Sequence, residues 1–511
     1  MHLLLPGRHH LLTNAQLEFL TLWTEGADAQ VTALLWAVTS ANHAGTRRNP
    51  LPAHRREAAI EGLAAELTVP SYVYLVDDIG TNPRFGDYLL KKIEVDSQGR
   101  FRLTPADTLV WAASPELDEQ FARLGFRVLT EAGPPPWQVL DELVAVGLAG
   151  RSWRNAETFL RRVHRASRRL LLKYDFDDLI LDLHRHPVGT ADGDLTATRD
   201  YNVYVRAFDE GAERKFALIR DHVRPGRIVD IGCCTGSLLQ QLSRDDRLRE
   251  SDFYGIELAR PLYAECLHRK EQGAFGSDHV FFYQANVAER ALFRPGSIDT
   301  FTTFSLTHEL ESYQGRATLE RFIELLREQL AVGGRWLNVD VVGPDDGDQE
   351  VYLWLESASG RTDDHLAEPE GRQELKAYLA GLSTLGRFYR FARDFRRHEG
   401  YQLPFREETL QGERYLVLRL RDACEFLSKK DYLDNWRSEM HETFCFWSFA
   451  DWQAALARAG LAVGAGSRAF TNPWIVTHRY EGKARLFQRQ GDALAPLPWP
   501  VTNMLLVAEK R

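Results

Sequence analysis

Short apolar runs of strand length alternate with amphipathic segments in both parts of the chain. Helical patterns such as NAQLEFLTLW lie between the runs of the first part, which are residues 2–7, 33–41, 72–78 and 108–114. The runs of the second part are residues 227–232, 252–258, 280–286, 297–305 and 335–342. Such alternation predicts α/β architecture, with parallel sheets covered by helices on both faces.

The same pattern divides the chain into two doubly wound parallel-sheet domains. The first is expected over residues 1–150, followed by a helical bridge and polar linker over 151–200. The second is expected over 201–511, with a mostly helical insertion at about 345–440, where strand signals are few. The strand pattern then resumes and ends at residues 502–510.

Composition limits the possible functions. Hydrophobic and charged contents of 44% and 26% are ordinary for a globular protein. A net charge of -9, from 63 basic and 72 acidic residues, argues against a non-specific nucleic-acid binder. The five cysteines have neither zinc-site spacing nor the density of a secreted scaffold, so no metal and a cytoplasmic location are expected. No apolar run reaches 18 residues, so no membrane span is expected.

The sharpest local pattern is IVDIGCCTG, residues 228–236, a strand that ends in a glycine turn before a helix. Gly232 and Gly236 allow a ligand to approach the backbone closely, and the N–H groups of the following helix can meet an anionic group. Dinucleotide-binding folds also use a glycine turn, so the turn alone is weak evidence. Glu257 ends the next strand, 27 residues beyond Asp230, where a carboxylate can accept both hydroxyls of a ribose.

Together these residues resemble the class I S-adenosylmethionine (SAM)-dependent methyltransferases, over roughly 200–345 and 440–511. The resemblance implies that SAM is the cofactor and that the closing strand is reversed, whereas a dinucleotide-binding unit would have six parallel strands. It places Cys234 at the middle glycine of the first motif and Asn286 opposite the adenine. The cofactor-binding residues that it implies are Asp230, Gly232, Cys234, Gly236, Glu257, Asn286, Ser305 and Tyr204.

The loop after the fourth strand, residues 304–313, lies beside the sulfonium in the resembled fold. His308 is therefore a candidate general base for an acceptor hydroxyl or amine, with Glu309 to orient it. The alternative is that His308 caps the following helix or packs against the cofactor. Methyl transfer depends mainly on alignment, so it does not require a base. The aromatic-rich segment 431–452 and the insertion are expected to build the acceptor pocket, although such aromatics are more often core residues.

The first domain resembles the nucleotidyltransferase family of NMN adenylyltransferases over most of residues 1–130. The matching segments begin with PGRHHLLTNAQ and TSANHAGTRRNP, and the resemblance implies a nucleotide site at Gly7, Arg8, Ser40 and Asn42. The family's HxGH motif is replaced here by Thr13-Asn14-Ala15-Gln16, which cannot carry positive charge to a phosphate. No ISGTxIR-like motif follows residues 126–128. Adenylyl transfer is therefore expected to be lost, and both nucleotide binding and a purely structural role stay open.

These patterns favour a fusion protein whose second domain is a SAM-dependent methyltransferase acting on a small molecule, with a nucleotide-linked acceptor as one option. One alternative is an active nucleotidyltransferase with an accessory SAM-binding domain. Another is a SAM-fold protein that only senses SAM or performs other chemistry. RNA methylation is disfavoured by the acidic balance, although residues 161–169 are rich in arginine.

Overall fold

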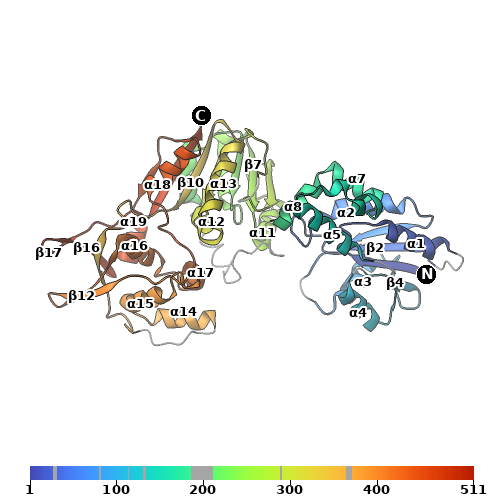
Figure 1. The fold of residues 1–511 in the computed structure, drawn as a ribbon, viewed down its shortest axis with the longest axis horizontal. Helices are drawn as coiled ribbons and strands as arrows, with labels where there is room; N and C mark the ends of the chain where they lie inside the picture. Colours follow the sequence, from blue (N-terminus) through green and yellow to red (C-terminus); the bar gives the residue numbers. More distant parts are fainter. Residues whose placement is uncertain are drawn as a thin grey trace. The chain divides into compact units, whose positions relative to one another are not determined.

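The computed structural model of the 511-residue chain describes residues 1–26, 31–79, 82–112, 114–129, 134–185, 211–287, 291–363 and 371–511. The chain forms two compact units, Met1–Gly193 and Asp194–Arg511 (Figure 1). No helix in the described ranges has the length and apolar character that crossing a bilayer requires.

The first unit contains a sheet of five parallel strands in the order β3-β2-β1-β4-β5. Leu3 and Leu5 of the first strand pack into one apolar core and Leu4 into another, so helices cover both faces, as predicted. The strands are β1 (His2–Gly7), β2 (Ala33–Val38), β3 (Ser71–Leu75), β4 (Thr108–Val110) and β5 (Arg127–Val128). The helices between them are α1 (Asn14–Glu25), α2 (Ala53–Ala64), α3 (Phe85–Asp96) and α4 (Pro115–Arg123).

The helices that follow the last strand complete the core of this unit and do not form a separate bridge. Trp153, Phe159, Leu171 and Ile180 are buried in the same apolar cluster as the sheet residues. Their amphipathic helices bury an apolar face by packing α7 on α2 and α8 on α5. Residues 186–200 of the predicted bridge lie outside the described ranges. The helices are α5 (Pro136–Leu148), α6 (Glu157–Arg161), α7 (Arg165–Lys173) and α8 (Phe176–Arg185).

The main sheet of the second unit has the order β14-β18-β10-β9-β6-β7-β8, with β15 (Arg468–Phe470) also paired to β18. The strands from β10 to β8 are parallel, and β18 runs antiparallel to both β10 and β14. The predicted reversal of the last strand is therefore confirmed. The strands are β6 (Arg227–Ile231), β7 (Asp252–Glu257), β8 (Val280–Gln284), β9 (Ile298–Phe304), β10 (Leu330–Val341), β14 (Leu461–Val463) and β18 (Asn503–Lys510).

Helices cover both faces of this sheet (Figure 1). Side chains of α10 (Ser237–Leu242) and α11 (Arg260–Glu271) share one core with Ile228 of β6. Side chains of α12 (Thr307–Gln314), α13 (Arg316–Gln329) and α18 (Phe449–Arg458) share the opposite core with Val229. Alternate residues of β6 thus face opposite layers, which explains why Ile228 and Val229 are both apolar.

The insertion contains a second sheet beside its helices, and the prediction of a mostly helical region did not include this sheet. This antiparallel sheet has the order β12-β13-β11-β16-β17. Its two final strands come from beyond the predicted insertion. The strands are β11 (Glu350–Leu355), β12 (Arg406–Leu410), β13 (Glu413–Arg419), β16 (Ala484–Gln490) and β17 (Ala493–Pro496). The accompanying helices are α14 (Arg372–Ala380), α15 (Thr384–Asp394), α16 (Leu420–Lys429), α17 (Trp436–Glu439) and α19 (Pro473–Ile475).

Candidate functional site

The turn between β6 and α10 has an unusual backbone conformation. Gly232, Cys234 and Gly236 all have left-handed backbone angles, with φ of 70°, 53° and 75°. The N–H groups of Gly232 and Cys233 donate to the carbonyl of Ile256, so the turn is fastened to the end of β7. A Cβ atom at Gly236 would lie 3.2 Å from two phenylalanine rings, which would have to shift to admit a side chain there. Cys234 holds this conformation without being glycine, which is typical of strained functional turns.

Glu257, at the end of β7, holds the same turn through its carboxylate. Its Oε2 accepts the N–H of Cys234 at 2.9 Å, and its Oε1 accepts the N–H of Ala259 at 2.8 Å. The side chain is 8% exposed, and burial raises its pKa to about 7, with the negative charge of Glu309 adding to the effect. A buried carboxylate with this pKa gains from a cation placed beside it.

Asp230, the last polar residue of β6, is also buried. It accepts a hydrogen bond of 2.7 Å from the hydroxyl of Thr302 on β9. Burial raises its pKa to about 6. Burial raises the pKa of the Cys233 thiol, and the negative charges of Glu257 and Asp230 raise it further. Negative charge therefore gathers around the turn from two neighbouring strands.

The loop after β9 lies directly against the glycine turn. A Cβ atom on Gly232 would meet the side chain of Leu306 at 3.4 Å. Ser305, with a left-handed φ of 52°, donates its N–H to the carbonyl of Val339 at 2.9 Å and leaves its side chain exposed. The structure thus brings the loop predicted to border the sulfonium next to the turn predicted to hold the cofactor.

His308 lies in this loop's helix and has two carboxylate partners. Its Nδ1 donates to Asp340 Oδ1 at 2.6 Å, and its Nε2 lies 3.4 Å from Glu442 Oε2. Burial alone would lower the pKa of the imidazole, but Asp340 and Glu442 raise it well above its ordinary value. Asp340 also accepts hydrogen bonds from the N–H and the hydroxyl of Thr307.

This geometry disfavours the general-base role predicted for His308. A base needs an unprotonated nitrogen that faces the acceptor, whereas both nitrogens of His308 point at carboxylates and the ring is 5% exposed. The partner that orients His308 is Asp340 at the end of β10, not Glu309. Glu309 is buried and acts on the pKa of Glu257 instead.

The remaining predicted residues of the second unit have different outcomes. Asn286 follows β8, so it lies at the same end of the sheet as Glu257 at the end of the neighbouring β7, and is half-buried. Tyr204 lies outside the described residues. The predicted aromatics of the acceptor segment form core, since Trp436, Phe444, Trp447 and Trp452 are all buried.

Sequence reasoning missed Asp340 and Glu442. Asp340 carried a signal, because an acid that ends a strand beside the cofactor turn was a candidate site residue. Glu442 carried none, because only the folded chain brings its segment to α12.

In the first unit, the predicted nucleotide-binding residues are held by shared hydrogen-bond partners, Asp78 and Arg56. The Ser40 hydroxyl donates to Asp78 Oδ2 at 3.3 Å, and Asn42 exchanges hydrogen bonds with the backbone of Asp78. The buried guanidinium of Arg56 donates to the carbonyls of Arg8, Thr39 and Ser40. Gly7 ends β1, so all four predicted residues lie at the carboxyl ends of β1 and β2.

The residues in the register of the HxGH motif form a capping box at the start of α1. Thr13 Oγ1 accepts the N–H of Gln16, and Gln16 Oε1 accepts the N–H of Thr13. Both side chains are buried. They satisfy the first turn of the helix and are therefore not available to a phosphate.

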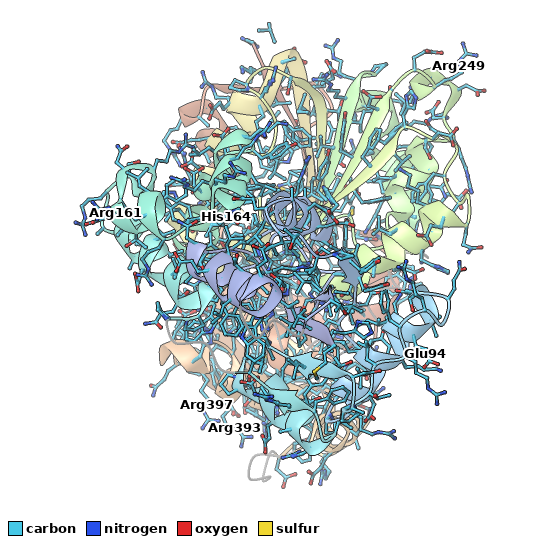
Figure 2. The ribbon with its side chains drawn as sticks, turned by 90° about the vertical axis from the view of Figure 1, so that its right-hand side faces the viewer. Glu94, Arg161, His164, Arg249, Arg393 and Arg397 are labelled. Carbon is cyan, nitrogen blue, oxygen red and sulfur yellow. The ribbon has the colours of Figure 1, made fainter. Side chains whose placement is uncertain are left out.

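Three arginines of the arginine-rich stretch form ion pairs with carboxylates. Arg161 projects from the surface of the first unit, whereas His164 lies further inside (Figure 2). The ion pairs are Arg161–Glu157, Arg162–Glu142 and Arg165–Glu66. Pairing of these three arginines reduces the positive stripe that a phosphate backbone would need.

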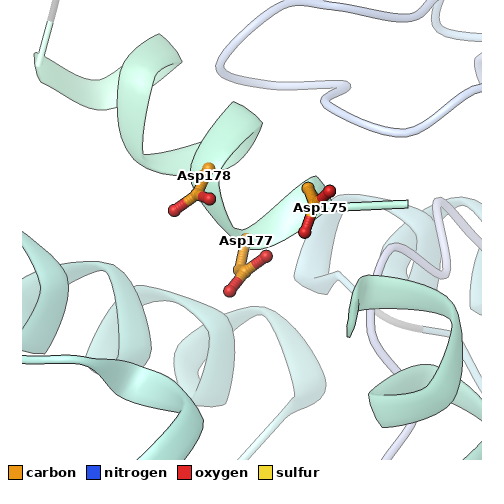
Figure 3. Close-up of side chains that lie close together, drawn as sticks. All are labelled: Asp175, Asp177 and Asp178. Carbon is orange, nitrogen blue, oxygen red and sulfur yellow. The ribbon is translucent and has the colours of Figure 1, made fainter. Parts of the chain in front are cut away.

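Three aspartates at the start of α8 lie close together (Figure 3). They are Asp175, Asp177 and Asp178, and each forms an ion pair with the guanidinium of Arg154. Their charge is thus offset by an arginine, and the group is a structural ion-pair cluster.

Comparisons with known proteins give structural similarity but no sequence match. A scan against protein-family models found no matching family, and a search of curated proteins found no matching protein. A SAM-dependent methyltransferase from Mesorhizobium loti is 16% identical, with a TM-score of 0.32 over 59% of this chain and 100% of its own. The geranyl diphosphate C-methyltransferase of Streptomyces coelicolor A3(2), solved with S-adenosyl-L-homocysteine, is 10% identical, with a TM-score of 0.30 over 58% and 79%. The [4+2]-cyclase SpnF is 14% identical, with a TM-score of 0.26 over 59% and 82%. Similarity at this level carries no argument about function, which must come from the site itself.

Proposed function

We propose that the second unit binds SAM and transfers its methyl group to a small molecule. The observation that carries this proposal is the left-handed turn after β6, fastened by the carboxylate that ends β7. The sheet supports it. In a dinucleotide-binding fold the sixth parallel strand lies beside the fifth, whereas here the reversed β18 takes that place beside β10.

The charge of the site also distinguishes the two kinds of cofactor. SAM carries a sulfonium and an ammonium group, and a dinucleotide carries an anionic pyrophosphate. Asp230, Glu257 and Glu309 place buried carboxyl groups around the turn, and the pKa of Glu257 is about 7. A cationic ligand stabilises these carboxylates in their charged form, while a pyrophosphate would be repelled.

The residues then have the following proposed roles. The backbone of the turn approaches the amino-acid end of the cofactor, and Glu257 keeps spare lone pairs for the ribose hydroxyls while it holds Cys234. Asn286 is placed to accept from the adenine amino group. When SAM is bound it supplies an activated methyl group whose sulfur leaves with the bonding electron pair. The protein's task is to align the acceptor with that methyl group.

Calorimetry of the full chain with SAM, S-adenosylhomocysteine and NADH tests the cofactor. We expect SAM to bind and NADH not to bind, and Glu257→Gln to reduce SAM affinity at least about 100-fold. Glu250→Gln is a matched control, because that carboxylate is 90% exposed on the same unit. NADH binding, or full SAM affinity in Glu257→Gln, would refute the placement. Formation of S-adenosylhomocysteine with a metabolite extract then separates methyl transfer from SAM sensing.

We also infer that the first unit has lost adenylyl transfer. The capping box formed by Thr13 and Gln16 supports this inference, because these side chains satisfy the helix and bring no positive charge. The full chain incubated with ATP and NMN is expected to release no pyrophosphate above a protein-free control. Release of pyrophosphate would favour the alternative of an active nucleotidyltransferase.

A further inference from the structure

We propose that Glu442 is a positioning residue for methyl transfer. Through its contact with the imidazole of His308 it fixes the segment 441–447 against the loop beside the glycine turn. This segment would then set where the acceptor meets the methyl group. The inference rests on the proposed function, because it concerns the acceptor side of the same site.

Glu442 contacts both Tyr313 and His308 in a buried environment. Glu442 is 1% exposed, and its Oε1 accepts the hydroxyl of Tyr313 at 3.1 Å while its Oε2 faces His308 Nε2. Phe444 packs its ring edge-on against the imidazole at 5.0 Å. Water is thus excluded from an ion pair that joins α12 to a segment far away in sequence.

A second group of hydrogen bonds runs beside the ion pair. The Ser312 hydroxyl donates to the carbonyl of His308 at 2.7 Å and accepts the N–H of Thr443 at 2.8 Å. Further along, Arg316 donates to the carbonyl of Phe446. The segment is therefore attached to α12 and to the start of α13 over its length.

The same segment is attached on its other side to the insertion. Lys429 of α16 donates to the carbonyl of Glu442 and pairs with Glu425 at 2.7 Å. Glu425 accepts the N–H of Cys445 at 2.6 Å. Segment 441–447 thus connects the helices packed on the second sheet with the loop at the cofactor turn, and Glu442 is its charged contact with that loop.

The charges around His308 explain why this contact depends on Glu442. The groups that face the ring are Asp340 from β10 and Glu442 from the segment, with Tyr313 and Lys429 bonded to Glu442. A buried imidazolium between two carboxylates is stabilised by both. Glutamine at position 442 keeps the shape and a hydrogen-bond acceptor but removes one charge, so the pKa of His308 should fall and the contact should weaken.

The test compares the full chain with Glu442→Gln, Glu442→Asp and the control Glu250→Gln, whose carboxylate is 90% exposed. Histidine NMR follows the protonation of His308, whose signal is assigned by its absence from the spectrum of His308→Asn. Hydrogen exchange measures the exchange rates of the amides of residues 441–447, and calorimetry measures the affinity for SAM. We expect the pKa of His308 to lie well above its ordinary value in the wild type and in the control, and to be lower in Glu442→Gln.

In Glu442→Gln the amides of 441–447 should exchange at least about tenfold faster, while SAM affinity stays within about twofold of wild type. Glu442→Asp, which keeps the charge, should restore protonation of His308. Titration of wild-type His308 near its ordinary pKa, or unchanged amide exchange in Glu442→Gln, would overturn the proposal. The first of these measurements uses only the wild-type protein, so it does not depend on whether a variant folds. Failure of SAM to bind the wild type would refute the proposed function and with it the role of Glu442 in methyl transfer, whereas the histidine and exchange readings would still report the contact between Glu442 and His308.

Discussion

Glu257→Gln offers the strongest test of the cofactor site, because stability and binding should change in opposite directions. Burial raises the pKa of Glu257 from 4.5 to about 7 in the folded protein. The folded state therefore binds this proton more tightly than the unfolded state does. Stability from this group is fully present below about pH 4.5 and is lost as the pH rises to about 7. At about 1.4 kcal/mol per pKa unit, the loss is about 3 kcal/mol.

Glutamine does not ionise, so the variant lacks this loss. It does lose one of the two hydrogen bonds that the carboxylate accepts from Cys234 and Ala259, at a cost of about 1 kcal/mol. The variant should therefore be about 1 kcal/mol less stable than wild type at pH 4.5 and about 2 kcal/mol more stable at pH 8. The gain in stability accompanies a loss of SAM binding, which is the usual relation between a strained site and its scaffold.

Urea unfolding of wild type and variant at several pH values between 4.5 and 8 measures this difference. Titrating groups that do not interact with Glu257 are present in both proteins and cancel. A constant difference across the pH range would show that Glu257 is not a strained buried carboxylate, and the electrostatic argument for a cationic cofactor would fail with it. A crossing near pH 5 to 6 is the expected result.

Three further changes test other parts of the structure. Gly236→Ala forces a Cβ atom against two aromatic rings at a left-handed position, so calorimetry should show SAM affinity reduced at least about 100-fold; unchanged affinity would remove the turn from the site. Thr13→Ala removes the N-cap of α1 and should lower the free energy of unfolding by about 1 kcal/mol in urea, while Thr32→Ala, an exposed threonine, should not. Asp340→Asn should lower the pKa of His308 in histidine NMR, and an unchanged pKa would contradict the assigned ion pair.

The parts of the site that lie close together in sequence could be predicted. Strand, turn and helix of residues 228–242 follow from one apolar run and two glycines, and Glu257 follows from the next strand. Parallel pairing brings the carboxyl ends of neighbouring strands to one edge of the sheet, so the sequence order of these residues was enough. The second sheet could not be predicted in this way. Strands β12 and β13 are rich in charge, and β11 pairs with β16 from well beyond the expected insertion.

Thr13-Asn14-Ala15-Gln16 shows how one sequence pattern can carry two interpretations. Aligned with a catalytic motif, it is a motif that has lost its charge; considered as a helix start, it is a threonine followed three residues later by glutamine, the pattern of a capping box. The local pattern alone was therefore sufficient to predict the structural role.

His308 shows the opposite limit, because its local pattern suggests a free histidine beside an acid, and the acid next to it in sequence is not its partner. Adjacent residues on a helix point in different directions, and here Glu309 acts on the pKa of Glu257 while His308 meets Asp340 from β10. A second carboxylate, from segment 441–447, faces the other ring nitrogen, and together with Asp340 it raises the pKa of His308 well above its ordinary value. The protonation state of a buried histidine is thus a property of the tertiary structure, and its chemical role follows only when every charge that faces it has been identified.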